Sequence, residues 1–277
     1  RSEFIDGLRN VVETSNDPTA NFLSQKLFEL LHDDLGILED LNGDGSVTIT
    51  DIELQTNVDQ PGVQPSNLYM QWNLKLGGQL VNAGTGIDFD LGVPGLGLET
   101  RGAVKVDIGW DMDFGFGIGG GKGFYLDLSA DDELRLDVDV TLPGGGLTGR
   151  LAVLQLDAND KGGTGLGATI AVNLFANTPG GTDDERVGLA DFGNIRFDAG
   201  IAAEANVDLG LELQLNSDLV PGADTVFPKV KADFELAWGI GDRATHDLVA
   251  FSDIGDSIQD GLKRVAFDNI GLDMGSF

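Results

Sequence analysis

Two stretches of this chain alternate between apolar and polar side chains with a period of two. Over residues 98–118 the even positions are mostly apolar and the odd positions carry the charges, and over residues 195–215 the apolar side chains fall on the odd positions. Because successive side chains of a β-strand point to opposite faces of its sheet, this period indicates strands with one apolar and one acidic face. At about 3.3 Å per residue, each stretch would extend roughly 70 Å if it were straight. We therefore expect long strands that bend or bulge at glycines. These glycines are Gly102, Gly109, Gly200 and Gly210.

Shorter segments with the same period fill most of the chain between residues 66 and 245. Glycine-rich turns at 119–121 and 144–146 separate some of these segments, as is typical of hairpin connections. An antiparallel sheet with one buried and one solvated face accounts for the alternation. The sequence therefore predicts a mainly β fold, with a large curved antiparallel sheet arranged as a sandwich or as an open barrel or roll.

Both ends of the chain carry apolar residues at helical spacing. Leucines recur at steps of three and four up to residue 39, and Ile254, Ile258, Leu262 and Val265 share one helical face within residues 246–268. We expect both amphipathic helices to pack on the apolar face of the sheet. The predicted division of the chain is a helical segment with its following loop (1–65), the antiparallel β domain (66–245) and a closing helix (246–277).

A short internal similarity links the two ends. Residues 6–11 (Asp-Gly-Leu-Arg-Asn-Val) and residues 260–265 (Asp-Gly-Leu-Lys-Arg-Val) are identical at four of six positions. One interpretation is a tandem array, in which residues 246–277 contain the start of a next repeat. The other is a chance likeness between two amphipathic helices.

Composition excludes several classes of function. The chain has 46 Asp and Glu against 17 Lys and Arg, a net charge of −29, so a nucleic acid would be repelled. It has no cysteine and two histidines, which excludes disulfides, thiol chemistry, cysteine-ligated zinc and a histidine-rich metal site. We expect no membrane span, because no apolar run approaches about 18 residues. No signal peptide is visible, so the chain is expected to be cytoplasmic or a piece of a longer protein.

The clearest motif lies in residues 40–51, which read Asp-Leu-Asn-Gly-Asp-Gly-Ser-Val-Thr-Ile-Thr-Asp. Oxygen-bearing side chains at loop positions 1, 3 and 5 surround a hard cation, and glycine at position 6 permits the sharp turn. Position 7 offers its backbone carbonyl, position 9 binds through water and position 12 closes the shell. The predicted calcium ligands are therefore Asp40, Asn42, Asp44, Ser46, Thr48 and Asp51.

This loop resembles an EF-hand loop but departs from it at position 12, where Asp51 replaces glutamate. Aspartate at this position resembles the calcium loops of dockerin modules, and Glu53 is an alternative closing ligand. The alternative without metal is a pair of Asn-Gly and Asp-Gly turns. There is one such loop, so a structural Ca²⁺ is expected rather than a cooperative sensor. Extracellular modules of this kind bind at about 10⁻⁴–10⁻³ M, which suits calcium levels outside cells.

Catalytic signatures are lacking. The sequence has no Gly-x-Ser-x-Gly motif, phosphate-binding loop or dinucleotide fingerprint. Carboxylates are abundant, but no pair is marked by neighbouring aromatic, histidine or arginine residues. We therefore expect that this protein is not an enzyme.

Taken with the calcium loop and the long alternating strands, two further segments support a resemblance. These are residues 151–160 (Leu-Ala-Val-Leu-Gln-Leu-Asp-Ala-Asn-Asp) and 184–192 (Asp-Glu-Arg-Val-Gly-Leu-Ala-Asp-Phe). Together they resemble a repeat module of the very large, acidic, calcium-binding surface and adhesin-like proteins of bacteria. The resemblance implies an extracellular or cell-surface location. It also implies a structural or adhesive role stiffened by calcium, with neighbouring repeats of the same chain as partners.

An alternative function comes from the aromatic residues of the alternating segments. A curved sheet lined by them would enclose a lipid or another apolar ligand, although the same side chains would also fill a core beneath the two helices. A glycan-binding role would need an exposed aromatic side chain beside the calcium loop, and Tyr69 is the nearest in sequence. The aromatic residues are Trp72, Trp110, Phe114, Phe116, Phe234 and Trp238.

Overall fold

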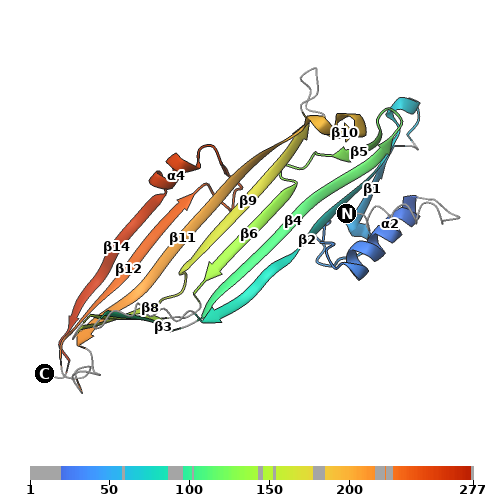
Figure 1. Ribbon diagram of the computed structural model, residues 1–277. Coiled ribbons are helices and arrows are strands. Elements are labelled where there is room, and N and C mark those ends of the chain that lie inside the picture. The colour runs from blue at the N-terminus through green and yellow to red at the C-terminus, as the bar shows by residue number, and fades with distance from the viewer. Residues whose placement is uncertain are drawn as a thin grey trace. The chain divides into compact units, whose positions relative to one another are not determined.

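The computed structural model describes residues 20–57, 60–86, 96–101, 103–142, 146–151, 154–176, 185–215, 222 and 227–275 (Figure 1). Six helical segments are present in these ranges. They are α2 (Ala20–Phe28), the π-helical turn η1 (Glu29–Asp34), the 3₁₀ turns η2 (Ile49–Asp51), η3 (Pro65–Asn67) and η4 (Leu189–Asn194), and α4 (Ile254–Asp260). The strands are β1 (Ile52–Thr56), β2 (Tyr69–Gly86), β3 (Leu96–Arg101), β4 (Ala103–Gly119), β5 (Gly123–Asp127), β6 (Leu134–Thr141), β7 (Gly146–Leu151), β8 (Leu154–Asp160), β9 (Gly165–Ala176), β10 (Arg186–Gly188), β11 (Ile195–Leu215), β12 (Lys229–Ile240), β13 (Val249–Ala250) and β14 (Leu262–Asp273).

The strands confirm the predicted mainly β fold. They form a large open antiparallel sheet in the order β1-β2-β4-β6-β9-β11-β8-β7-β3, with β12 and β13 also paired to β11, β14 paired to β12, and the short β5 joining β4 and β10. The alternating stretch 195–215 is one 21-residue strand, β11. The stretch predicted over 98–118 forms two strands, β3 and β4, and the expected bend at Gly102 lies outside the described residues.

By its contacts the chain divides into two compact units, each built from three segments. Unit 1 comprises residues 1–78, 110–135 and 171–199, and unit 2 comprises residues 79–109, 136–170 and 200–277. Some long strands contribute residues to both units. The division into 1–65, 66–245 and 246–277 stays a prediction.

In unit 1 the predicted N-terminal helix packs on the apolar face of the sheet. Leu27 and Leu31 belong to one core cluster with Trp72, Leu74 and Phe116 of β2 and β4. The indole N–H of Trp72 donates a hydrogen bond of 3.0 Å to Ser24 Oγ, so the buried polar groups of the helix and the strand satisfy each other. Residues 1–19, the first half of the predicted helical segment, lie outside the described residues.

The chain that follows η1 stays close to β2. Gly77 N–H donates to Ile37 O at 2.8 Å, and Glu39 N–H donates to Lys75 O at the same distance. A Cβ atom on Gly77 would lie 2.8 Å from Glu39 Cγ and 2.9 Å from Trp110 O. This close approach therefore requires glycine at position 77.

In unit 2 the closing segment corrects one prediction. The helical pattern expected over 246–268 forms a helix only at Ile254–Asp260, and residues 262–273 form strand β14, which pairs with β12. Gly261 ends the helix where the indole of Trp238 leaves no room, since a Cβ atom would lie 2.5 Å from its Nε1. Beyond this point the β-branched and aromatic residues favour a strand whose backbone is satisfied by β12.

Candidate functional site

The loop predicted to bind calcium connects α2 and η1, which together form the helical arm of unit 1, to strand β1. Leu38 forms an isolated antiparallel bridge with Leu76 just before the loop begins. After the loop, η2 leads directly into β1, which pairs with β2 from Ile52↔Leu74 to Thr56↔Met70. Both ends of the loop are therefore fixed on the same strand.

Carboxylate and amide oxygens inside the loop hold its backbone. Asp40 Oδ1 accepts hydrogen bonds from the N–H groups of Gly43 and Asp44 at 2.7 and 3.3 Å, and Asp40 Oδ2 accepts one from Gly45 at 2.6 Å. Asn42 Oδ1 accepts from Asp44 N–H at 2.9 Å, and Asp44 Oδ1 accepts from Ser46 N–H at 2.9 Å. Positions 1, 3 and 5 thus turn their oxygens toward the inside of the loop.

Two glycines make this winding sterically available. Gly43 has φ +73° and Gly45 has φ +86°, and both values lie in the left-handed region that other residues rarely adopt. No atom lies within 4 Å of a Cβ placed on either glycine, so backbone conformation and not space requires glycine here. Gly45 occupies loop position 6, as the calcium motif demands.

Asp51, at loop position 12, is fully buried with 0% of its surface exposed. Its Oδ1 accepts from Leu41 N–H at 2.9 Å and Asn42 N–H at 3.2 Å, and its Oδ2 accepts from Thr48 N–H at 2.8 Å. Burial alone would raise the pKa of Asp51, but the hydrogen bonds from Thr48, Asn42 and Leu41 together hold that pKa below its usual value. Asp51 and Thr48 also form a capping box at η2.

The donor set fits a hard cation at three of the six predicted positions. Asp40 Oδ2, Asn42 Oδ1 and Asp44 Oδ1 each accept one hydrogen bond and keep a second lone pair for a cation. Asp51 and the hydroxyl of Thr48 are instead occupied within the loop and at the start of η2. Within the described ranges, no three His, Cys, Asp or Glu side chains converge closely enough to hold a metal. Calcium binding therefore stays a prediction.

Glu53, the alternative closing ligand, points to a different place. Its Oε2 accepts from Asn73 Nδ2 at 3.2 Å and from Gln55 Nε2 at 3.0 Å. Glu53 lines a cavity of about 230 Å³ together with Asp113 and eight other residues, which are Leu41, Asn73, Leu74, Phe114, Gly115, Asp127, Ser129 and Ala130. Burial raises the pKa of Asp113, and the neighbouring Lys75 opposes this.

A second candidate site is the apolar face of unit 2. The pairing of β11, β12 and β14 places apolar side chains side by side on this face, and neighbouring rows repeat the arrangement. The Phe234 and Phe267 rings, for example, lie 5.0 Å apart between centroids. The aligned rows are Leu213–Val230–Leu272, Leu209–Phe234–Phe267 and Val207–Leu236–Val265.

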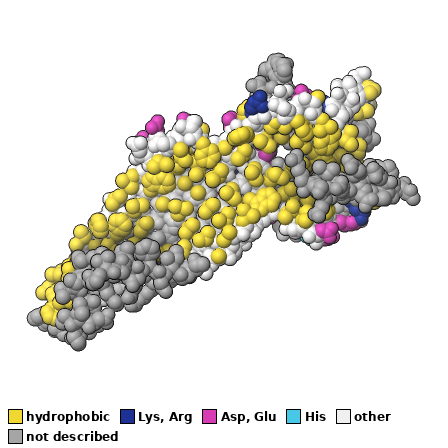
Figure 2. All heavy atoms as spheres, in the orientation of Figure 1, with side chains coloured by type: hydrophobic (Ala, Val, Ile, Leu, Met, Phe, Trp, Pro, Cys, Tyr) yellow, Lys and Arg dark blue, Asp and Glu magenta, His cyan; other side chains and the backbone are white. Residues whose placement is uncertain are grey.

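Large side chains of this face remain open to solvent. Exposure is 41% for Val230, 53% for Val265, 56% for Phe267 and 62% for Leu272. Figure 2 shows hydrophobic side chains gathered over β11 and β12, with few Asp or Glu side chains among them. Among the described residues of unit 2, helix α4 reaches only the Trp238 end, where the Trp238 indole N–H donates to Ile258 O at 3.3 Å. Within the described ranges, the apolar face of unit 2 thus has no helical cover like that of unit 1.

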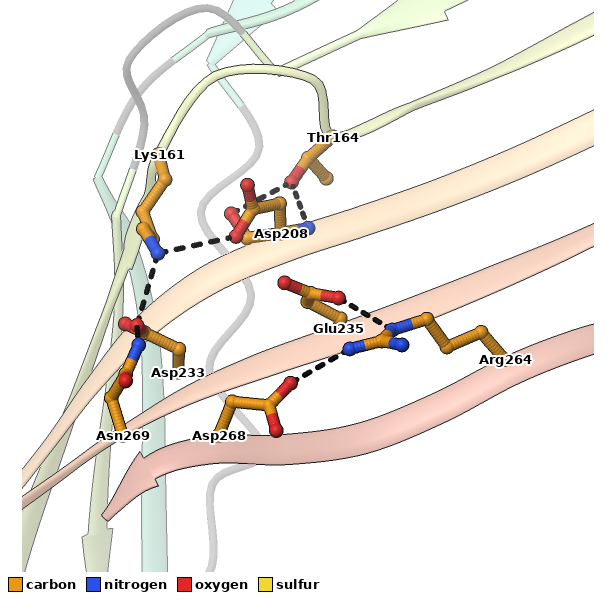
Figure 3. A network of polar contacts seen from close by, with 8 residues as sticks. All are labelled: Lys161, Thr164, Asp208, Asp233, Glu235, Arg264, Asp268 and Asn269. Carbon is orange, nitrogen blue, oxygen red and sulfur yellow. Dashed lines mark hydrogen bonds and ion pairs between the residues drawn. The ribbon is translucent and has the colours of Figure 1, made fainter.

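The opposite face of the same strands is charged (Figure 3). Lys161 Nζ lies 3.1 Å from Asp233 Oδ2 and 3.8 Å from Asp208 Oδ1. Arg264 donates to Glu235 at 2.6 Å and to Asp268 at 2.8 Å. Hydrogen bonds from Asn269 and then Lys161 lower the pKa of Asp233. Most charges that would disfavour an apolar ligand are therefore on the reverse side of the sheet, and Asp160, which pairs with Leu209, is the exception at the β8 end of one apolar row.

The comparisons with known proteins add no assignment. Neither the family models, nor the curated proteins, nor the solved structures contain a match to this chain. No helix in the described part of the chain is long and apolar enough to cross a membrane.

The extent of the open apolar face does not follow from the predicted helix at the end of the chain. Val265 and Phe267 were expected on a helix that covers the sheet, whereas they extend the uncovered face themselves. The signal available in the sequence was the alternation of Val265, Phe267 and the surrounding charged residues, which is compatible with a strand as well as a helix.

Proposed function

We propose that this chain is a non-enzymatic binding module whose apolar sheet face in unit 2 holds the acyl chains of a lipid or a similar apolar ligand. The observation that carries the proposal is the set of aligned, solvent-exposed side chains on β8, β11, β12 and β14. Soluble proteins rarely expose apolar patches larger than a few hundred Å² unless something binds there. A ligand with long, flexible hydrocarbon chains matches a face that extends over several strands and whose aligned rows on β11, β12 and β14 carry no charged side chain.

The size of the face sets the expected affinity. Completing the burial of a half-exposed Leu, Val or Phe is worth about 1 kcal/mol. Eight such side chains would give about 8 kcal/mol, which corresponds to micromolar binding before the cost of association. The eight side chains are Leu154, Leu156, Leu213, Val230, Leu262, Val265, Phe267 and Leu272.

Native mass spectrometry after gentle purification tests this proposal. Lipid-sized adducts on the monomer, with saturable uptake of a fluorescent fatty acid, are the expected result. A bare monomer that takes up no fatty acid would contradict the proposal, and so would a bare dimer, because a second copy would then cover the face.

A matched pair of variants locates the binding. Phe267 lies on the apolar face, whereas its neighbour Ala266 pairs with Glu235 on the charged face. Phe267→Gln should weaken fatty-acid binding about fivefold by removing the burial of one ring, and Ala266→Gln should leave it unchanged. Equal effects of the two substitutions would place the ligand elsewhere.

A second candidate function is supported by the loop at 40–51. We infer a module of a large bacterial surface protein, in which Ca²⁺ bound by Asp40, Asn42 and Asp44 stiffens the junction between the helical arm and the sheet. The supporting observation is that the loop is wound by two left-handed glycines and fixed at both ends on β2. An extracellular location, an adhesive role and neighbouring repeats as partners belong to this proposal.

Calcium titration followed by thermal unfolding tests the second function. At 10 mM calcium and a Kd of about 10⁻⁴–10⁻³ M, binding to the folded state alone adds about 1.4–2.7 kcal/mol. For a chain of this size, that is a rise in Tm of roughly 3–8 °C. Asp44→Ala should abolish the rise, and Asp34→Ala, an exposed aspartate at the end of η1, should not. A Tm that is the same in calcium and in excess chelator would refute this second function.

A further inference from the structure

Unit 1 contains a cavity of about 290 Å³ that neither proposed function uses. It lies where the β4–β5 hairpin, η3, the start of β2 and β10 meet. Both tyrosines of the chain line it, together with Arg186 and Lys122. The remaining lining residues are Ser66, Asn67, Leu68, Gly119 and Gly121.

Close backbone packing shapes the walls of this cavity. A Cβ atom on Gly120 would lie 1.9 Å from Pro65 O, so the hairpin turn contacts η3 directly. A Cβ atom on Gly117 would lie 2.4 Å from Tyr125 Oη, so the absence of a side chain there lets the tyrosine ring cross β4. The Tyr125 hydroxyl donates to Gln71 Oε1 at 3.1 Å, which fixes the ring in a buried position.

The guanidinium of Arg186 lies over two aromatic rings in cation–π contacts. Its guanidinium carbon lies 3.9 Å from the ring centroid of Tyr69 and 5.5 Å from that of Tyr125. Such stacking stabilises the cation through the ring faces and leaves the N–H groups at the edge of its plane available for a ligand. No ion pair joins Arg186 to a carboxylate within the described ranges of the chain.

The carboxylate that lies opposite Arg186 directs one of its two oxygens to other residues. Asp127 is opposite Arg186 in the pairing of β5 with β10. Its Oδ2 accepts hydrogen bonds from Gln71 Nε2 at 2.5 Å and Ser129 Oγ at 3.0 Å. Lys122 places a second positive charge beside Arg186, since its Nζ donates a hydrogen bond to Arg186 O at 2.6 Å.

The local charge of the cavity is opposite to that of the protein. In a chain of net charge −29, the described lining contains two cations and no acidic side chain. Ser66 and Asn67 add side-chain donors and acceptors of the kind that bind hydroxyl groups. The volume is close to the lower end of the range for small-molecule sites.

We propose that this cavity binds a carboxylate-bearing sugar, such as a uronic acid, with the carboxylate held by the guanidinium of Arg186 and the hydroxyls by the side chains of η3. Planar, two-point hydrogen bonding to a carboxylate is the geometry for which arginine is suited. This site is distinct from the apolar face and from the loop at 40–51, so its failure would leave both of those proposals standing.

Ligand titrations distinguish the two parts of the proposed recognition. Sodium glucuronate, glucose and sodium acetate are titrated into the protein, and the ring signals of its two tyrosines are followed by NMR, with the three tryptophan indoles as internal controls. Saturable shifts of the tyrosines with glucuronate, no shifts with glucose and at least tenfold weaker binding of acetate are expected. Binding of acetate as tight as that of glucuronate would overturn the sugar assignment, and no saturable shift with any of the three would overturn the site.

Paired variants tie the binding to one guanidinium. Arg186→Gln should weaken glucuronate binding about tenfold or more, since it removes a charge-assisted contact. Arg196→Gln removes the same charge from an exposed arginine whose guanidinium donates to Gly193 O and Ile195 O outside the cavity, and should bind normally. Should Arg186→Gln fail to fold, Ser66→Ala provides the second variant, with a several-fold loss for glucuronate and none for acetate. Normal glucuronate affinity in a folded Arg186→Gln protein would refute the proposal.

Discussion

Replacing the buried carboxylate of Asp51 by an amide should destabilise unit 1 strongly. Asp51→Asn keeps one acceptor oxygen for the N–H groups of Leu41 and Asn42, but turns an NH₂ group toward Thr48 N–H, which Asp51 Oδ2 contacts at 2.8 Å. Hydrogen bonds to a charged group contribute about 1.5–3 kcal/mol, and an unsatisfied buried N–H costs about 1–3 kcal/mol. We expect a loss of about 3 kcal/mol in the free energy of unfolding.

The effect should depend on pH with a definite sign. Because the pKa of Asp51 in the folded state lies below its usual value of 3.8, the unfolded chain binds more protons between these two values. The stability contributed by the carboxylate is therefore complete above the unfolded pKa and is lost as the pH falls through the folded pKa. The difference between wild type and Asp51→Asn should shrink accordingly at about pH 2.5.

Urea unfolding in excess chelator measures this difference without any contribution from calcium. In a Trp238→Phe background the fluorescence comes from Trp72 and Trp110, which both belong to unit 1. With a slope of about 2 kcal/mol per M, the midpoint should fall by roughly 1.5 M. Asp34→Asn, at an exposed site, is the control. A loss below about 1 kcal/mol for Asp51→Asn at pH 7, or a loss equal to that of Asp34→Asn, would show that these hydrogen bonds do not hold the loop.

Two further predictions concern other parts of the chain. In unit 2 a Cβ atom on Gly167 would lie 1.8 Å from Arg243 Nη1, which donates a hydrogen bond to Asp139 Oδ1 at 2.9 Å. Gly167→Ala should therefore displace the arginine and lower the free energy of unfolding, measured by thermal unfolding, by about 1–2 kcal/mol. Gly193→Ala, with no atom within 4 Å of the added Cβ, is its control, and equal Tm values for the two variants would contradict the clash. In unit 1, burial raises the pKa of Glu133 above its usual value of 4.5, although a hydrogen bond from Leu174 N–H opposes this. Above pH 4.5 the folded state therefore binds more protons than the unfolded chain, so the free energy of unfolding should rise as the pH falls from 7 toward 5. Glu133→Gln should raise Tm at pH 7 and flatten this dependence, and an unchanged pH profile would show that Glu133 is not its source.

The strands could be read from the sequence because their signal is local. The strict alternation of residues 195–215 gave the observed bounds of β11, since each side chain faces either the apolar or the charged side of the sheet. The same principle failed for residues 262–273. There the spacing of the apolar residues from Ile254 to Val265 also matches a helix. Pairing with β12, a long-range interaction, stabilises the strand instead.

The candidate sites differ in how far a sequence can predict them. The loop at 40–51 is continuous in the chain, so the oxygens of Asp40, Asn42 and Asp44 and the glycine turns could be placed in order. What could not be foreseen is that Asp51 turns inward, because its partners depend on how η2 meets β1. The cavity at Arg186 is assembled from four segments between residues 66 and 186, and no local pattern marks it.

The edge of the sheet favours a small apolar ligand over a second copy of the chain. Within the described strands β14 pairs only with β12, so its outer edge is available for pairing. Two features oppose edge-to-edge association. The register shift between Lys231 and Asp233 of β12 interrupts the regular ladder with β14, and Asn269 has φ +51° at this point. Arg264 and Lys263 add charge to the same strand. Bulges and charges are the devices by which natural sheets prevent pairing with another chain. A face that is apolar and exposed, on a strand whose edge is protected in this way, is better suited to hold hydrocarbon chains than to continue the sheet into a neighbouring molecule.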